Sequence, residues 1–223
     1  MTMSPHAIDS PVPVSREIAK EGESQAFLPY PDLGENLSKV PIHVRPDVAY
    51  YIQRMGFLPN AIKLYLHVPW IAEPLFNINN AIMRDERNSL SEHFKYRLSF
   101  LASRENGCAY CTAHHAATLK RRWNYSEKLL ADVLGNDEPA DEREAVAFEF
   151  VREASHNPGG VSDDLRARLA KHFAPQEVME IVLVVGFWKM YNLMHDAMKL
   201  PIEDPVIRDR CWVEYTPDTN PTR

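Results

Sequence analysis

The sequence predicts an all-α protein, and three of its features support that fold class. Apolar residues recur at helical spacing through most of the chain, whereas runs that alternate apolar and polar residues, as strands do, are scarce. Residues that favour helix N-termini stand before several of these segments. Only eight glycines occur in 223 residues. We therefore expect helices and no substantial sheet.

The first 45 residues differ in kind from the rest. They contain six prolines, which oppose regular helices and sheet ladders because proline lacks a backbone N–H group. We predict that residues 1–45 form an extended arm over the body of the protein or over a neighbouring subunit. Disorder is the alternative, and the aromatic residues Phe27 and Tyr30 favour docking.

Residues 46–200 are predicted to form one helical domain. Gly56 and the Asn106-Gly107 pair end helices, Ser89 to Glu92 has the spacing of a capping box, and Pro175 suits a first turn. The expected helices span residues 47–55, 60–67, 71–84, 89–104, 108–122, 124–134, 141–155, 162–171 and 175–198. Residues 201–223 contain four prolines and are predicted to form an irregular tail.

Composition and charge exclude several classes of function. The net charge is −6 without a dense basic stripe, so we expect no nucleic-acid partner. The most apolar stretch, Ile181 to Trp188, is shorter than the ~20 residues needed to cross a bilayer, so we expect no membrane insertion. There is no recognisable secretion signal, and three cysteines do not suit a secreted disulfide scaffold. A cytoplasmic location is expected.

Two cysteines stand three residues apart at the start of a predicted helix. A helix N-terminus stabilises anions, and the thiolate is the reactive form of cysteine. Because each helical residue advances by about 100°, Cys108, Cys111 and His115 share one face. His114 lies on the other side of Cys111 and is the second candidate. This arrangement is typical of thiol redox chemistry.

A CxxC pair also occurs in zinc sites, in haem attachment sites and as inert core residues. A structural zinc site needs four ligands, and no second CxxC or spaced histidine pair is present. Haem attachment needs histidine directly after the second cysteine, where Thr112 stands. A zinc site and an inert buried pair both stay open as alternatives. Cys211 is expected to be an ordinary thiol, and His195-Asp196 a polar pair whose members do not face each other.

At these residues a family resemblance becomes plain. Ser103-Arg-Glu-Asn-Gly-Cys-Ala-Tyr-Cys-Thr-Ala-His-His115 resembles the signature of the alkylhydroperoxidase-like branch of the carboxymuconolactone decarboxylase superfamily, and within it the peroxidase-related subgroup. The resemblance covers roughly residues 50 to 200. Its further matches are Gly56-Phe-Leu-Pro-Asn60, Leu90-Ser91, Pro175-Gln-Glu-Val178 and Asn192.

The resemblance implies a mechanism and partners. Cys111 would attack a small, organic hydroperoxide, Cys108 would resolve the product to a disulfide, and His115 would relay the proton. No cofactor or metal is implied, but an external dithiol must reduce the disulfide; in the best-known relatives a lipoylated protein supplies it. The resemblance also implies a homo-oligomer, either a dimer, a trimer or a hexamer, and a role in antioxidant defence.

The chain departs from the family pattern at two positions. Tyr96 stands where the family has a glutamate, and Tyr110 stands where some relatives have histidine. Tyrosine, with an ordinary pKa of about 10, is a poor base at neutral pH, so a weakened peroxidase is expected. Tyr96 is expected either to hydrogen-bond His115 or a water, or simply to pack. The alternative functions are a redox sensor or disulfide-exchange protein without turnover, and a decarboxylase, against which the CxxC counts.

Overall fold

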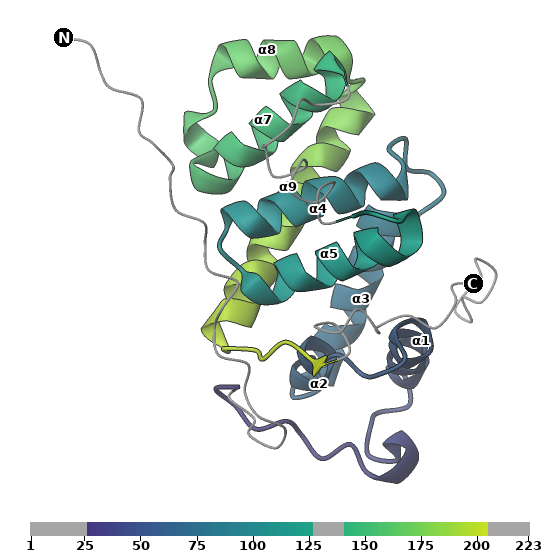
Figure 1. Ribbon diagram of the computed structural model, residues 1–223. Helices are drawn as coiled ribbons and strands as arrows, with labels where there is room; N and C mark the ends of the chain where they lie inside the picture. The colour runs from purple at the N-terminus through teal and green to yellow at the C-terminus, as the bar shows by residue number, and fades with distance from the viewer. Residues whose placement is uncertain (1–25, 127–140, 205–223) are drawn as a thin grey trace.

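The computed structural model describes residues 26–126 and 141–204 (Figure 1). Within these two ranges there is no strand, which confirms the all-α prediction. The expected helix at residues 124–134 lies almost wholly outside the described residues. The α-helices are α1 (Arg45–Met55), α2 (Asn60–Tyr65), α3 (Pro69–Arg84), α4 (Glu92–Glu105), α5 (Ala109–Trp123), α7 (Glu142–His156), α8 (Asp163–His172) and α9 (Pro175–Ala197).

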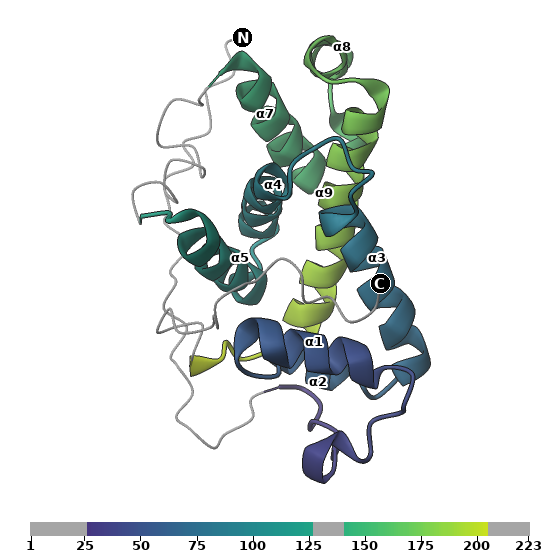
Figure 2. The same cartoon turned by 90° about the vertical axis from the view of Figure 1, so that its right-hand side faces the viewer.

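Helix α4 lies at the centre of the bundle, in contact with α5, α7 and α9. The long helix α9 runs past it, with α7 and α8 at one end and α1 and α2 at the other (Figures 1 and 2). Helix α3 lies beside α9. None of the described helices is both long and apolar enough to cross a bilayer.

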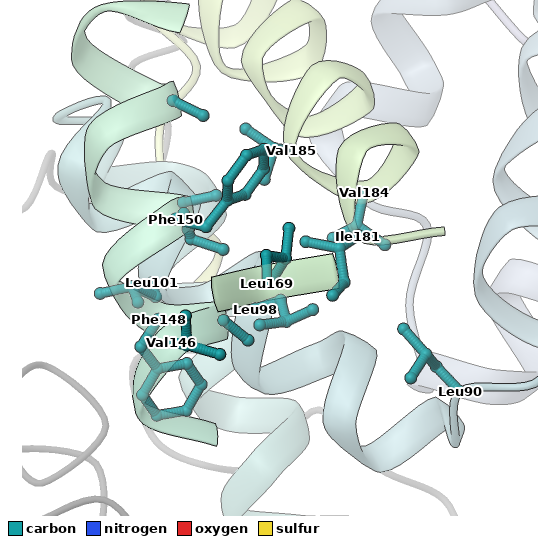
Figure 3. Packing of buried hydrophobic residues seen from close by; sticks show 14 of the residues in the cluster. Leu90, Leu98, Leu101, Val146, Phe148, Phe150, Leu169, Ile181, Val184 and Val185 are labelled. Carbon is teal, nitrogen blue, oxygen red and sulfur yellow. The ribbon is translucent and has the colours of Figure 1, made fainter. Parts of the chain in front are cut away.

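Two hydrophobic clusters fill the bundle. In the first, side chains from α4, α7, α8 and α9 converge (Figure 3), with Leu98, Leu101 and Ile181 wholly buried. The second joins α1, α2 and α3 to the C-terminal half of α9 and to the start of α5. Cys108 and Cys111 belong to this second cluster. The cysteine pair therefore lies in the interior, where the ends of α5 and α9 meet.

Most helices begin at the residues that the sequence predicts. Asp141 caps α7 and Ser162 caps α8 through hydrogen bonds from their side chains to backbone amides. The capping box expected at Ser89 is wrong, because Ser91 caps α4 by accepting a hydrogen bond from the Phe94 amide. The amides of Ser89 and Leu90 instead donate to the carboxylate of Glu180 on α9.

The described part of the N-terminal arm lies against the body of the same chain. The Phe27 amide donates to the carbonyl of Met198 at 2.7 Å, and the His67 ring hydrogen-bonds the carbonyl of Pro29 at 2.8 Å. Val40 is buried in the second cluster. Residues 26–44 therefore help to cover the end of the bundle that holds the cysteines.

Candidate active site

The cysteine pair is placed by the turn between α4 and α5. Gly107 adopts a φ of +76°, a conformation that is strained for residues with a side chain, and this lets α5 run back along α4. Cys108 is then the N-cap of α5, and its Sγ accepts a hydrogen bond from the Cys111 amide at 3.4 Å. Both thiols are free and buried.

Burial dominates the acid–base behaviour of Cys111. Removal from water raises the pKa of this thiol well above its ordinary value, and the neighbouring Cys108 raises it further. A hydrogen bond from Asn192 opposes the shift without cancelling it. Burial therefore outweighs the stabilisation of a thiolate that was expected from the helix N-terminus, and Cys111 needs a base to react at neutral pH.

A candidate for that base comes from α9. The Nδ1 atom of His195 lies 2.9 Å from the Sγ atom of Cys111, and its Nε2 atom hydrogen-bonds the Tyr65 hydroxyl. Burial first, and then the charge of His114, lowers the pKa of His195 to about 3, so the ring is neutral at neutral pH. Sequence reasoning missed this role, because 84 residues separate His195 from Cys111.

His115 is connected to Cys111 less directly. Its Nδ1 atom lies 3.3 Å from the hydroxyl of Ser103, and its ring stands edge-on to Trp188. The Asn192 amide donates to the same hydroxyl at 3.1 Å and also hydrogen-bonds Cys111. Burial lowers the pKa of His115 to about 3. A polar chain through Ser103 and Asn192 thus links His115 to the sulfur.

The two buried histidines predict a specific pH dependence of stability. Their pKa values of about 3 lie below the ordinary value of 6.5, so between these limits the unfolded state binds more protons than the folded state. The free energy of unfolding should fall as the pH is lowered through this window, by about 1.4 kcal/mol per pH unit for each histidine. Urea unfolding at about pH 7.5 and about pH 5.5 measures the drop.

The matched variants of that experiment are His115→Gln and the exposed His156→Gln. The first should reduce the drop by about 1.4 kcal/mol and the second should leave it unchanged. An equal drop in wild type and His115→Gln would contradict the assignment of a buried, neutral histidine.

Tyr96 packs against His115, as one of its two expected roles had it, and its hydroxyl bonds Arg84 rather than His115. Its hydroxyl accepts a hydrogen bond from the Arg84 guanidinium at 2.8 Å, and its ring packs edge-on against His115 with 6.0 Å between centroids. Burial raises the pKa of Tyr96, but the charges of Arg84, Arg54 and Arg122 lower it by more. Tyr96 therefore supports His115 by packing, and its hydroxyl faces the arginines.

Tyr110 and His114 meet at a carboxylate that the sequence did not single out. Glu203, just after α9, accepts hydrogen bonds from the Tyr110 hydroxyl and from the His114 ring, both at 2.8 Å, and from the Asn60 amide. Burial raises the pKa of Glu203, and the charge and hydrogen bond of His114 bring it below its ordinary value. The Tyr110 ring lies 5.1 Å from the His195 ring, between Glu203 and the sulfur site.

Comparisons with known proteins agree with this fold. No family model matches the chain. The uncharacterized protein YnjA of Escherichia coli (strain K12) is 26% identical over 168 residues, which are 75% of this chain and 92% of that protein. An uncharacterized peroxidase-related protein from Silicibacter sp. TM1040 superposes with a TM-score of 0.72 at 21% identity, over 83% of this chain and 96% of that one.

A second crystal structure carries a more specific description. It is the alkylhydroperoxidase AhpD core of an uncharacterized peroxidase-related protein from Ralstonia eutropha JMP134, with a TM-score of 0.71 at 20% identity, over 84% of this chain and 98% of that one. The likeness extends over nearly the whole of both structures. The fold that the resemblance implied is confirmed: the chain has the all-helical fold of these AhpD-like, peroxidase-related structures.

Proposed function

We propose that the protein is a thiol peroxidase that reduces small organic hydroperoxides through Cys111 and Cys108. One observation carries the proposal: the Sγ atom of Cys111 lies 2.9 Å from a neutral imidazole nitrogen of His195, with the second thiol beside it. Thiol catalysis needs a nucleophile next to a base, and a third group that orients the base. The likeness to peroxidase-related proteins supports the same reaction class.

In the first step the Cys111 sulfur attacks the terminal oxygen of the peroxide while its proton passes to His195; because the pKa of His195 lies far below that of Cys111, no free thiolate forms beforehand. The O–O bond breaks, and Cys111 becomes a sulfenic acid. The departing alkoxide takes the proton back from His195 and leaves as an alcohol. The Tyr65 hydroxyl holds the imidazole in line with the sulfur throughout.

The second step resolves the sulfenic acid. The sulfur of Cys108 attacks that of Cys111, an S–S bond forms, and the hydroxyl leaves as water once it has gained a proton. The two sulfurs lie within 4.8 Å of each other, so a small side-chain movement suffices. An external dithiol then reduces the disulfide by thiol–disulfide exchange.

Counting thiols after a stoichiometric pulse of cumene hydroperoxide tests this proposal. Every variant should also carry Cys211→Ser, so that only the paired thiols are counted. The parent should lose two thiols, Cys108→Ser should lose one as a sulfenic acid, and Cys111→Ser should lose none on the same time scale. Equal reactivity of Cys111→Ser and the parent would end the proposal.

We further propose that the chain forms a homo-oligomer through α3 and α9. Along α9 an apolar stripe faces solvent, and α3 beside it exposes more apolar side chains. Exposed apolar side chains on neighbouring helices are typical of subunit contacts. The exposed side chains are Met179, Val182, Leu183, Met190 and Leu193 on α9, and Trp70, Ile71 and Ile78 on α3.

A charge placed in this stripe should dissociate the oligomer. Leu193, which is 71% exposed, can be replaced by glutamate without disturbing the core of one chain. Light scattering should give a multiple of 25.6 kDa for the wild type and for the control Lys171→Glu, and a lower mass for Leu193→Glu. A wild-type protein that is monomeric at high concentration would contradict the assignment.

A further inference from the structure

The sulfur site has a third metal-binding group that the sequence does not place there. The Sγ atoms of Cys108 and Cys111 and a ring nitrogen of His195 all lie within 4.8 Å of one another. We propose that the reduced protein binds one zinc ion through these three side chains, and that bound zinc and the disulfide are mutually exclusive states of the site.

The donor set suits zinc in kind and in number. Two thiolates and one imidazole, with a fourth position left to water or another small ligand, make up a known type of zinc site. From the sequence, zinc was disfavoured because a fourth protein ligand and a spaced histidine pair were lacking. The fold supplies the histidine from α9, and an open site needs no fourth side chain.

The geometry is close to that of a tetrahedral site. Bonds of about 2.3 Å to sulfur and about 2.0–2.1 Å to nitrogen put the ligand atoms about 3.5–3.8 Å apart. The Sγ atom of Cys111 and the Nδ1 atom of His195, now 2.9 Å apart, must therefore separate slightly, and no pair must close by more than about 1 Å. Rotation of the side chains is enough for movements of this size.

The surroundings of the three ligands favour a metal. The Tyr65 hydroxyl hydrogen-bonds Nε2 of His195, which leaves Nδ1 free to point at the sulfurs; such partners orient metal-binding histidines. The Cys111 amide donates to the Sγ atom of Cys108, as suits a thiolate ligand. Two thiolates and a dication form a neutral unit, which a buried site tolerates better than separate charges.

Zinc bound in this way would govern the redox chemistry of the pair. Both sulfurs would be engaged, so peroxide could react only as the metal leaves. Oxidation would then take two electrons from the two thiolates and form the S–S bond. The O–O bond of the peroxide would break, two protons from water would complete the alcohol and a water molecule, and Zn²⁺ would go to solvent. This inference concerns the site of the proposed peroxidase but does not depend on its turnover.

Metal titration of the full chain tests the inference. In a Cys211→Ser background, the reduced protein should take up one Zn²⁺ per chain, and Co²⁺ used as a probe should show thiolate-to-metal charge-transfer absorption. His195→Asn should weaken the affinity at least about 10-fold, and Cys108→Ser should remove the charge-transfer contribution of one thiolate. The exposed His156→Asn is the matched control and should bind as the parent does. Circular dichroism shows which variants are folded.

Three results would overturn the inference: no stoichiometric metal in the reduced protein, equal affinity in folded His195→Asn and the parent, or equal affinity in the disulfide form. Peroxide reactivity is measured separately on protein freed of metal by a chelator. Zinc uptake without peroxide reactivity would refute the proposed function alone, and peroxide reactivity without zinc uptake would refute this inference alone.

Discussion

Replacing His195 with asparagine should slow the reaction of Cys111 with cumene hydroperoxide by about 100-fold or more. The reason is that burial keeps Cys111 protonated at neutral pH, and in the proposed mechanism its proton passes to His195, whose ring contacts the sulfur. Stopped-flow measurement of thiol loss in metal-free, reduced protein gives the rate constants. Asparagine keeps a polar group of similar reach, so the loss reports proton transfer more than packing.

The pH profile separates a missing base from a damaged fold. If His195 acts as the base, the deficit of His195→Asn should shrink as the pH rises, because hydroxide then removes the thiol proton. Tyr65→Phe should show a smaller deficit, since the imidazole stays but loses the hydroxyl that orients it. A His195→Asn rate within about twofold of the wild type at neutral pH would contradict the assignment.

Replacing Glu180 with leucine should lower the free energy of unfolding by about 3–5 kcal/mol. The Lys95 side chain is wholly buried, and Glu180 is its ionic partner at 3.0 Å. The same carboxylate accepts the amides of Ser89 and Leu90 at 2.7 and 2.9 Å, which positions the start of α4. Urea denaturation measures the loss.

Two further variants separate the effect of burial from the loss of an ion pair alone. Glu149→Leu breaks an ion pair with Arg168 in which both side chains are more than 40% exposed, and should cost no more than about 1 kcal/mol. Lys95→Met combined with Glu180→Leu removes the stranded charge and should recover part of the loss. If Glu180→Leu and Glu149→Leu lowered the free energy of unfolding equally, burial of the Lys95–Glu180 pair would contribute nothing to stability.

Local rules predicted most of the helices. Ser162, Asp141 and Pro175 act within one turn of chain, so their positions in the sequence reveal where α8, α7 and α9 begin. The start of α4 was misjudged because the amide of Ser89 bonds to Glu180, 91 residues away. A long-range partner of this kind leaves no local pattern.

The candidate site also combines residues that local spacing predicts with residues that only long-range contacts bring in. Helix α5 and its N-cap hold Cys108, Cys111 and His115. Their spacing in the sequence therefore predicted that they share one face of a helix. Tyr65 lies on α2, and His195 and Glu203 lie near and just after the end of α9, so only the fold brings them to the cysteines. The raised pKa of Cys111 also depends on burial, which the order of residues around a CxxC does not reveal.

Tyr96 is a position for which the motif left two interpretations open, a hydrogen bond or simple packing. The family pattern suggested a polar partner for His115 at this position, and the hydroxyl instead reaches Arg84 on α3. The cluster around it includes Glu92, one helical turn before Tyr96, which pairs with Arg122 and Arg84. A tyrosine at this position therefore belongs to an ionic cluster between helices as much as to the sulfur site.

The proposed mechanism gives the two thiols different roles, with Cys111 attacking the peroxide and Cys108 resolving the product. Peptide mass spectrometry can separate these roles. Cys108→Ser, in the Cys211→Ser background, is treated with one equivalent of cumene hydroperoxide while sulfenic acid is trapped. We expect the trapped oxidation product on Cys111, and none on Cys108 when Cys111→Ser is treated in the same way. A trapped product on Cys108 in Cys111→Ser, formed as fast as the product on Cys111 in Cys108→Ser, would contradict these roles.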